Sequence, residues 1–292
     1  MPTHKLNFAF FGTPEFSTII LDELEAAGYV PSLIVCSEDK PVGRKLIITP
    51  PHTKVWAEKR GIKVIQPKSI REERNPGITE IIKNLSQEIS GQQWDLFIVA
   101  AYGKIIPQAI LDIPTHGTLN VHPSLLPKLR GPSPIESAIL TEDETGMSIM
   151  VLDADMDHGP ILAQEKTVTG QWPEYADVLE NTLAHQGGTM LAGVIPSWMD
   201  GTLKGTVQDH TLATICKKIT KEDGLLDLNE SPEKNLRKIR AFCVWPRAYY
   251  MLNGLRIIVT KAHIEDGKLV LEKVIPEGKK EMSYADFVRG QK

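Results

Sequence analysis

The sequence predicts an α/β protein with a doubly wound, mainly parallel sheet and a small C-terminal β-barrel of the OB type. Over roughly the first two thirds of the chain, short apolar stretches alternate with amphipathic ones, which is typical of strands joined by crossover helices. Beyond residue 248, three short runs alternate apolar and polar residues, as the strands of a small barrel do. The chain has 292 residues, of which 41% are hydrophobic, enough for one large domain or two medium ones with their own cores.

The first βαβ unit is predicted at the N-terminus. Leu6 to Phe11 has the composition of a short buried strand. A Gly-Thr-Pro turn follows and places a proline at an early position of a helix, whose apolar face continues to Gly28. Ser32 to Cys36 is the next strand. Later segments repeat the alternation: strands at Lys63 to Ile65, Asp95 to Ala100, Gly117 to Val121 and Met147 to Leu152, helices at Thr79 to Ser90 and Tyr175 to Met199.

The first strand-to-helix turn does not favour a dinucleotide site. A Gly-x-Gly-x-x-Gly turn lets the backbone approach a pyrophosphate closely, whereas this turn offers only Gly12. A nicotinamide oxidoreductase is therefore disfavoured. In an open parallel sheet, a ligand is instead expected beyond the carboxyl ends of the strands.

Three polar residues are candidates for acyl-transfer chemistry: Asn120, His122 and Asp157. Asn120 and His122 lie two apart on a predicted strand and so face the same side. An amide can donate to a developing oxyanion, an imidazole can move a proton near neutral pH, and a carboxylate can orient the imidazole. On spacing alone a structural core histidine is the favoured interpretation, and Asp153 and Asp155 are rival carboxylates.

The chain resembles the folate-dependent formyltransferases. The segment NVHPSLLPKLRGPSPI followed by MDHGPIL is similar to the signature of that family, which selects Asp157 among the three carboxylates. More distant segments resemble the methionyl-tRNA formyltransferases: FFGTPEF, AYGKIIP, KITKEDGLLDL, IRAFCVWPRAYY and PEGKKEMSYADFVRG. His158 departs from the family, which often has Thr there.

The resemblance implies transfer of a formyl group from 10-formyltetrahydrofolate to the amino group of methionyl initiator tRNA, without a metal. Ser124, Leu125, Leu126 and Pro127 match the folate-binding segment of the family. Apolar side chains there could shape a slot, although a buried connecting loop is an equally good interpretation. A related enzyme acting on a sugar-nucleotide or glycinamide ribonucleotide amine is the nearest alternative. A nucleic-acid-binding module without catalysis is another.

The predicted tRNA contacts are basic. The segment from Ser37 to His52 is expected to be a mobile loop because Pro41 and Gly43 disfavour regular structure, and the resemblance gives Arg44 and Lys45 in it a role in binding the acceptor stem. From Thr214 onward there are 16 Lys and Arg against 11 Asp and Glu, a net charge of +5 in a chain of net charge −4. A cluster at Lys217, Lys218 and Lys221 is the candidate patch. A merely solvated surface is the alternative.

Domain and compartment expectations complete the prediction. Residues 1–200 are expected to form the catalytic domain, 201–213 a linker, and 214–292 a tRNA-binding barrel that is shorter than usual in the family. No apolar run reaches the roughly 20 residues that cross a bilayer. The three cysteines are widely spaced, without a Cys-x-x-Cys pair, and are expected as reduced thiols. We expect a cytoplasmic, monomeric enzyme.

Overall fold

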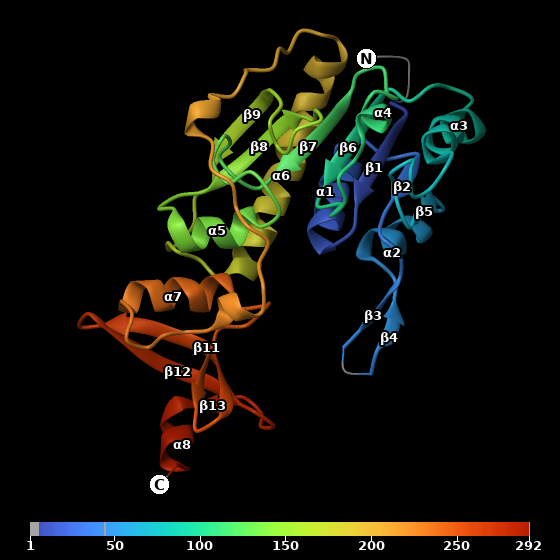
Figure 1. Ribbon diagram of the computed structural model, residues 1–292. Helices are drawn as coiled ribbons and strands as arrows, with labels where there is room; N and C mark the ends of the chain where they lie inside the picture. Colours follow the sequence, from blue (N-terminus) through green and yellow to red (C-terminus); the bar gives the residue numbers. More distant parts are fainter. Residues whose placement is uncertain (1–5, 44, 292) are drawn as a thin grey trace. The chain divides into compact units, whose positions relative to one another are not determined.

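A seven-stranded sheet forms the centre of the computed structural model, which describes residues 6–43 and 45–291 (Figure 1). The strand order is β5-β2-β1-β6-β7-β8-β9. The first five of these strands are parallel, whereas β8 runs antiparallel to both of its neighbours. The predicted mainly parallel sheet is thus confirmed, with strands β1 Phe8–Gly12, β2 Leu33–Val35, β5 Lys63–Ile65, β6 Leu96–Ala100, β7 Thr118–His122, β8 Gly146–Val151 and β9 Ile161–Lys166.

Helices cover both faces of this sheet, as its composition requires. Every residue of β1, β6 and β7 is buried, so neither face can be left to water. On one face, alternate strand residues such as Phe11 and Phe97 share a core with α3 (Ile78–Ser90) and α4 (Gln108–Leu111). On the other face, α1 (Glu15–Ala26) packs closely against α6 (Ala176–Met199). None of the helices in the described ranges is long and apolar enough to span a bilayer.

The segment from Ser37 to His52 is not the irregular loop that its composition predicts. Lys40–Val42 (β3) and Ile47–Thr49 (β4) pair as an antiparallel hairpin, and α2 (His52–Glu58) follows. In a two-stranded ribbon both strands are edge strands, where a proline such as Pro41 is tolerated. Gly43 supplies the left-handed turn residue, with a φ of 71°. The predicted tRNA-binding residue Arg44 lies outside the described residues.

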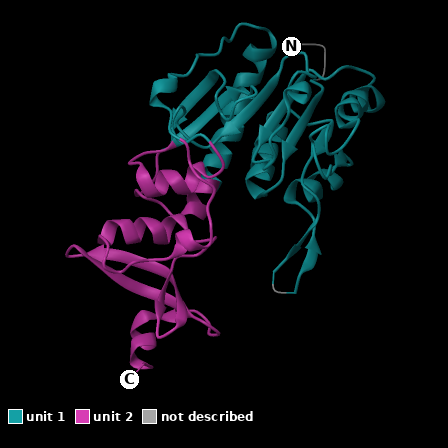
Figure 2. Ribbon diagram, in the orientation of Figure 1, with its two compact units in different colours: residues 1–130, 146–167, 181–214 teal, residues 131–145, 168–180, 215–292 magenta. Residues whose placement is uncertain are grey.

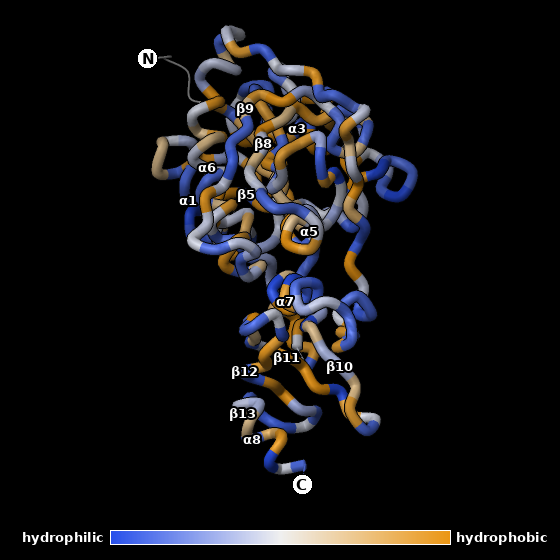
Figure 3. The backbone as a smooth tube through the Cα atoms, turned by 90° about the vertical axis from the view of Figure 1, so that its left-hand side faces the viewer, coloured by the Kyte–Doolittle hydropathy of each residue, from blue (hydrophilic) through white to orange (hydrophobic). Residues whose placement is uncertain are grey.

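The C-terminal part forms a separate four-stranded antiparallel sheet in the order β10-β11-β12-β13. Its core is apolar, with Ile257, Val259 and Val274 almost fully buried, and the tube of Figure 3 is hydrophobic over part of β11. The strands β11 and β12 join directly through a turn at Asp266 and Gly267, both left-handed. The elements are α7 Pro232–Ala241, β10 Tyr249–Leu252, β11 Leu255–Glu265, β12 Lys268–Pro276, β13 Met282–Ser283 and α8 Tyr284–Arg289.

The chain divides into two compact units that are interleaved in sequence (Figure 2). The first holds the large sheet and the second holds the small one. The helix α5 (Pro134–Thr141) belongs to the second unit although it follows β7 directly in the chain. The chain therefore enters the second unit three times, at residues 131–145, 168–180 and 215–292, and the first unit comprises 1–130, 146–167 and 181–214.

Two glycines of α6 differ sharply in their surroundings. A Cβ added at Gly187 would lie 2.7 Å from both Met147 Cε and Val121 Cγ1. The helix therefore approaches β7 and β8 closely only because this position lacks a side chain. Gly193, in the same helix, is exposed and would meet nothing within 4 Å.

We expect Gly187→Ala to destabilise the first unit by about 1–3 kcal/mol, because the added methyl group overpacks the helix–sheet interface. Gly193→Ala is the matched control and should stabilise by up to about 1 kcal/mol, since alanine is the better helix former. Urea unfolding of both variants measures the difference. A Gly187→Ala protein as stable as the parent would show that α6 does not pack on the sheet as described.

Candidate active site

Two of the polar side chains on the buried strand β7 belong to the residues predicted as catalytic. Asn120 is 8% exposed and His122 4% exposed, both on β7. They lie two apart and so face the same side of the sheet, as the sequence predicts. Buried polar groups require partners, so the atoms around these two side chains define the candidate site.

The imidazole of His122 is held by a backbone carbonyl. Its Nε2 lies 3.0 Å from the carbonyl oxygen of Leu129. Leu129 is in the left-handed region with a φ of 58°, a conformation that costs a non-glycine residue about 1–3 kcal/mol. Its N–H in turn donates to Thr214 Oγ1 over 2.9 Å. With Nε2 engaged in this way, Nδ1 is the ring nitrogen left to face the site.

Asp157 reaches both residues from a loop. Because β8 is antiparallel to β7, its end at Val151 lies beside Leu119, and the chain must return toward His122. The loop after β8 does so and places Asp157 Oδ1 3.7 Å from His122 Nδ1 and 3.4 Å from Asn120 Nδ2. The structure therefore brings together all three residues predicted as catalytic. The distance to His122 exceeds a hydrogen bond, so the Leu129 carbonyl is the group that orients the ring.

The loop that carries Asp157 is closed by several contacts. The N–H of Val151 donates to the carbonyl of Pro160 over 3.0 Å. His158 Nδ1 lies 2.8 Å from Asp153 Oδ2, and its ring stacks on His210 with centroids 4.0 Å apart. His158 is thus part of the loop closure. A Cβ at Gly159 would lie 2.0 Å from the Val151 carbonyl oxygen, so only glycine fits there.

Sequence reasoning missed two contributors to this site. The carbonyl of Leu129 is a backbone group, so no pattern of side chains predicts its contact with His122. Gln208 lies in the stretch expected as a linker, yet it is buried and its amide donates to the carbonyls of Asp157 and Gly159. A glutamine within an aperiodic polar stretch gives no local signal.

The segment from Ser124 to Pro127 is largely satisfied by its own surroundings. The N–H of Leu126 donates to Ser148 Oγ, and its carbonyl accepts from Gln164 Nε2 over 2.8 Å. Ser124 is fully buried, and its hydroxyl donates to the carbonyl of Lys128. Leu125 and Pro127 keep partly exposed side chains. Any ligand at this segment would therefore meet mainly apolar side chains.

Basic residues of the second unit are partly committed to its own structure. Arg237 donates to the carbonyls of Ile139 and Glu142 and pairs with Asp143, which ties α7 to the end of α5. Of the predicted tRNA-binding cluster, Lys217 pairs with Asp223. Lys218 and Lys221 are exposed, as is Lys45 in the hairpin of the first unit.

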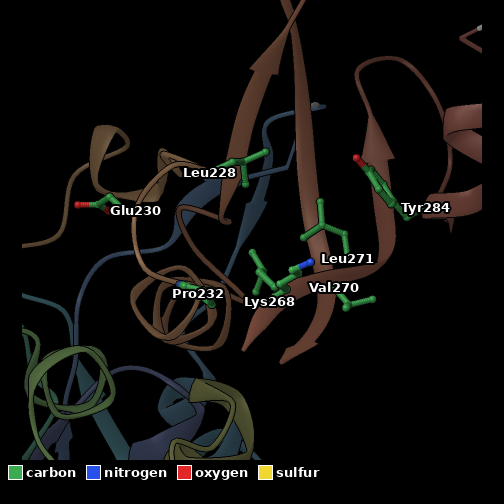
Figure 4. Close-up of a pocket in the computed structure, with 8 residues that line it drawn as sticks. Leu228, Glu230, Pro232, Lys268, Val270, Leu271 and Tyr284 are labelled. Atoms are coloured by element: carbon green, nitrogen blue, oxygen red, sulfur yellow. The ribbon is translucent and has the colours of Figure 1, made fainter. Parts of the chain in front are cut away.

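The second unit also contains a groove that is distinct from the catalytic constellation (Figure 4). It mixes apolar side chains from β12 with two charged ones, and none of the predicted site residues lines it. Over the described ranges, no cluster of three or more His, Cys, Asp or Glu is suited to a metal ion. The groove is lined by Leu228, Glu230, Pro232, Lys268, Leu269, Val270, Leu271 and Tyr284.

A comparison with protein families decides the class of this site. Residues 5–195 match the family described as formyl transferase, and residues 218–269 match the formyl transferase C-terminal domain. The chain belongs to the formyl transferase family. Asn120, His122 and Asp157 all lie within the longer matched segment.

Relatives and solved structures extend this finding. A methionyl-tRNA formyltransferase of Halalkalibacterium halodurans is 37% identical, covering 98% of this chain and 95% of the relative. One of Chloroflexus aggregans is 39% identical over 89% of this chain and 81% of the relative. The fold is similar to that of the Clostridium thermocellum methionyl-tRNA formyltransferase, with a TM-score of 0.59, 15% identity, and 93% and 98% of the two chains covered. HypX from Aquifex aeolicus in complex with tetrahydrofolic acid gives a TM-score of 0.66 at 15% identity, over 98% of this chain and 47% of HypX.

The cysteines are free, as expected, and one of them lies directly after β2. Cys36 is fully buried, and desolvation raises the pKa of its thiol to about 11. Cys243 is half-buried, and burial raises its pKa as well.

We expect Cys36 to resist alkylation in the native protein. At pH 8 a pKa near 11 leaves about 100-fold less thiolate than the ordinary value does, and burial blocks the reagent. Iodoacetamide labelling followed by peptide mass spectrometry should show Cys243 modified first and Cys36 only after unfolding. Native labelling of Cys36 at the rate of Cys243 would contradict the burial described.

Proposed function

We propose that the chain transfers a formyl group from 10-formyltetrahydrofolate to the free amino group of methionyl initiator tRNA. The observation that carries this is the convergence of Asn120, His122 and Asp157 at one site in a family member. The near full-length relatives named methionyl-tRNA formyltransferase support the choice of substrate. We further propose that the enzyme acts as a monomer in the cytoplasm, where translation begins.

The proposed chemistry follows from the side-chain atoms that converge at the site. 10-Formyltetrahydrofolate supplies the formyl carbon. A neutral amine attacks this carbon, a new C–N bond forms, the bond to the folate nitrogen breaks, and a proton moves from the amine to that nitrogen. Asn120 has a second Nδ2 hydrogen beyond the one facing Asp157, which can donate to the negative charge that develops on the formyl oxygen.

His122 and Asp157 are suited to the proton transfer. The Nδ1 of His122 and the Oδ1 of Asp157 face each other across 3.7 Å, a gap in which an amine hydrogen can be shared. With Nε2 donating to the Leu129 carbonyl, Nδ1 is the ring nitrogen that can take a proton from the amine, on the side of the Asp157 carboxylate. Asp157 thus stabilises the imidazolium that forms once the amine loses its proton.

For the folate, we propose that the segment from Ser124 to Pro127 forms one wall of the slot. The partly exposed side chains of Leu125 and Pro127 would contact the ring system. The backbone of Leu126 already has partners, which supports a wall of fixed shape.

For the tRNA, we propose contributions from both units. Residues 1–200 would carry the chemistry and 214–292 much of the affinity, joined through 201–213. Lys45, and Arg44 beside it, would contact the acceptor stem from the hairpin. Lys217, Lys218 and Lys221 would contact phosphates, since binding to a polyanion is largely electrostatic.

We expect the purified protein to formylate methionyl initiator tRNA, and His122→Ala and Asp157→Asn each to lower kcat by about 10²- to 10⁴-fold, because both act on charge that develops in the transition state. Folate binding should stay within about three-fold, and the double variant should cost little more than either single one. Steady-state formylation and a folate titration measure these quantities.

Two outcomes would contradict this assignment. Additive losses in the double variant would mean that His122 and Asp157 act independently. An inactive parent on charged tRNA that formylates a sugar-nucleotide or glycinamide ribonucleotide amine would move the protein to another branch of the family.

A charge-reversal variant tests the proposed tRNA patch. Changing Lys217, Lys218 and Lys221 together to Glu should weaken tRNA binding and flatten its dependence on salt, because fewer counterions are released. The matched control is Lys83→Glu, an exposed lysine on α3. Filter binding across a salt series measures both. Parallel curves of equal affinity for the parent and the triple variant would remove the patch from the tRNA surface.

A further inference from the structure

The loop that carries Asp157 depends on a side chain that is distant in sequence. Gln208 is 4% exposed. Its amide nitrogen Nε2 donates to the carbonyl of Asp157 over 3.0 Å and to that of Gly159 over 2.7 Å. These carbonyls flank His158 in the turn that aims the Asp157 carboxylate. Both hydrogens of the amide are therefore used on one turn.

Arg130 fixes the other end of the same amide. Its Nε and Nη2 both donate to Gln208 Oε1, over 3.2 and 2.6 Å. The guanidinium requires an oxygen and the two carbonyls require an N–H, so the amide can adopt only one of its two orientations. Arg130 is itself 8% exposed and follows Leu129, the residue whose carbonyl holds the His122 ring.

The hydrogen bonds of Arg130 and Gln208 therefore connect the backbone that holds His122 to the turn that carries Asp157. Asp157 has a φ of 49° and Leu129 a φ of 58°, so both backbone segments adopt conformations that need support from outside. One short route, from Leu129 through Arg130 and Gln208, joins the carbonyl that orients His122 to the turn that carries Asp157. A displacement of the backbone at Leu129 or at Asp157 would change the distance between His122 Nδ1 and Asp157 Oδ1.

We propose that Gln208 is a positioning residue for formyl transfer, which with Arg130 sets the place of Asp157 relative to His122. The inference rests on the proposed function for its catalytic readout. Gln208 has no role in binding the folate, and its effect on the rate passes through Asp157.

The variant Gln208→Glu tests this directly. A carboxylate still accepts from Arg130 but can no longer donate to the two carbonyls. We expect kcat to fall by about 10- to 100-fold, because small misplacements of a catalytic group have effects of this size, while the folate Kd stays within about three-fold. Gln208→Met has a similar side-chain volume and no charge, and it too cannot donate to the two carbonyls. It replaces Gln208→Glu in the test if that variant does not fold.

Asn7→Asp is the matched control for a buried amide changed to a carboxylate. Asn7 is 2% exposed in the same unit, and its Nδ2 donates to Ser86 Oγ and to the Gln93 carbonyl. It should lower stability while leaving kcat of the folded protein within about two-fold. A loss of kcat in the Gln208 variants no larger than in Asn7→Asp would overturn the inference.

A double variant separates positioning from general damage. If Gln208 acts through Asp157, adding Gln208→Glu to Asp157→Asn should change kcat by less than about three-fold. A full additional 10- to 100-fold loss would overturn the inference.

A readout without substrate keeps the inference apart from the proposed function. Hydrogen–deuterium exchange of the peptide covering residues 152–160 should become faster in Gln208→Glu and remain unchanged in Asn7→Asp. If the parent proves inactive on charged tRNA, the proposed function fails, and the exchange data alone decide whether Gln208 holds the turn. Unchanged exchange in this peptide would show that it does not.

Discussion

The candidate site depends on one constraint: a fully buried strand carries polar side chains that must find partners, and two of these are Asn120 and His122. Asn120 and His122 cannot turn to water, because every residue of β7 is buried. Two residues with left-handed backbone supply the partners. The Leu129 carbonyl holds the His122 ring, and the Asp157 carboxylate accepts from the Asn120 amide and lies 3.7 Å from His122 Nδ1. The buried polar groups thus constrain two loops, and the candidate site lies where these loops meet.

The parts of the fold that follow from local pattern could be predicted from the sequence. Strands such as β5 of the large sheet and β10 of the small one are found where their composition places them, because short runs of strand-forming residues between turn residues predict strands in either kind of sheet. The hairpin at Lys40–Val42 and Ile47–Thr49 was missed because Pro41 disfavours a central strand but not an edge strand. Gln208 could not be predicted either, because its partners lie about 50 residues away in the chain.

The net charge of the C-terminal part predicts its RNA-binding surface less well than the contacts of each basic residue do. The excess of basic residues after Thr214 predicts a polyanion partner, but some of it stabilises the second unit instead. Arg237 caps the carbonyl end of α5, Lys261 pairs with Glu272, and Lys273 pairs with Glu281. Such pairs leave the net charge unchanged and reduce the charge available to a ligand. A count of lysines and arginines therefore overstates the surface that can bind RNA.

The interleaving of the two units has a consequence for biosynthesis. The ribosome completes the segment 131–145 long before 215–292, so the first piece of the second unit must wait for most of its partners. The first unit is likewise unfinished until residue 214 has left the exit tunnel, although its five parallel strands are made much earlier. The first unit can be completed before residues 215–292 are made, whereas the second unit cannot be completed before the end of the chain. A single protease cut, or a gene fusion at one joint, cannot separate them as intact pieces.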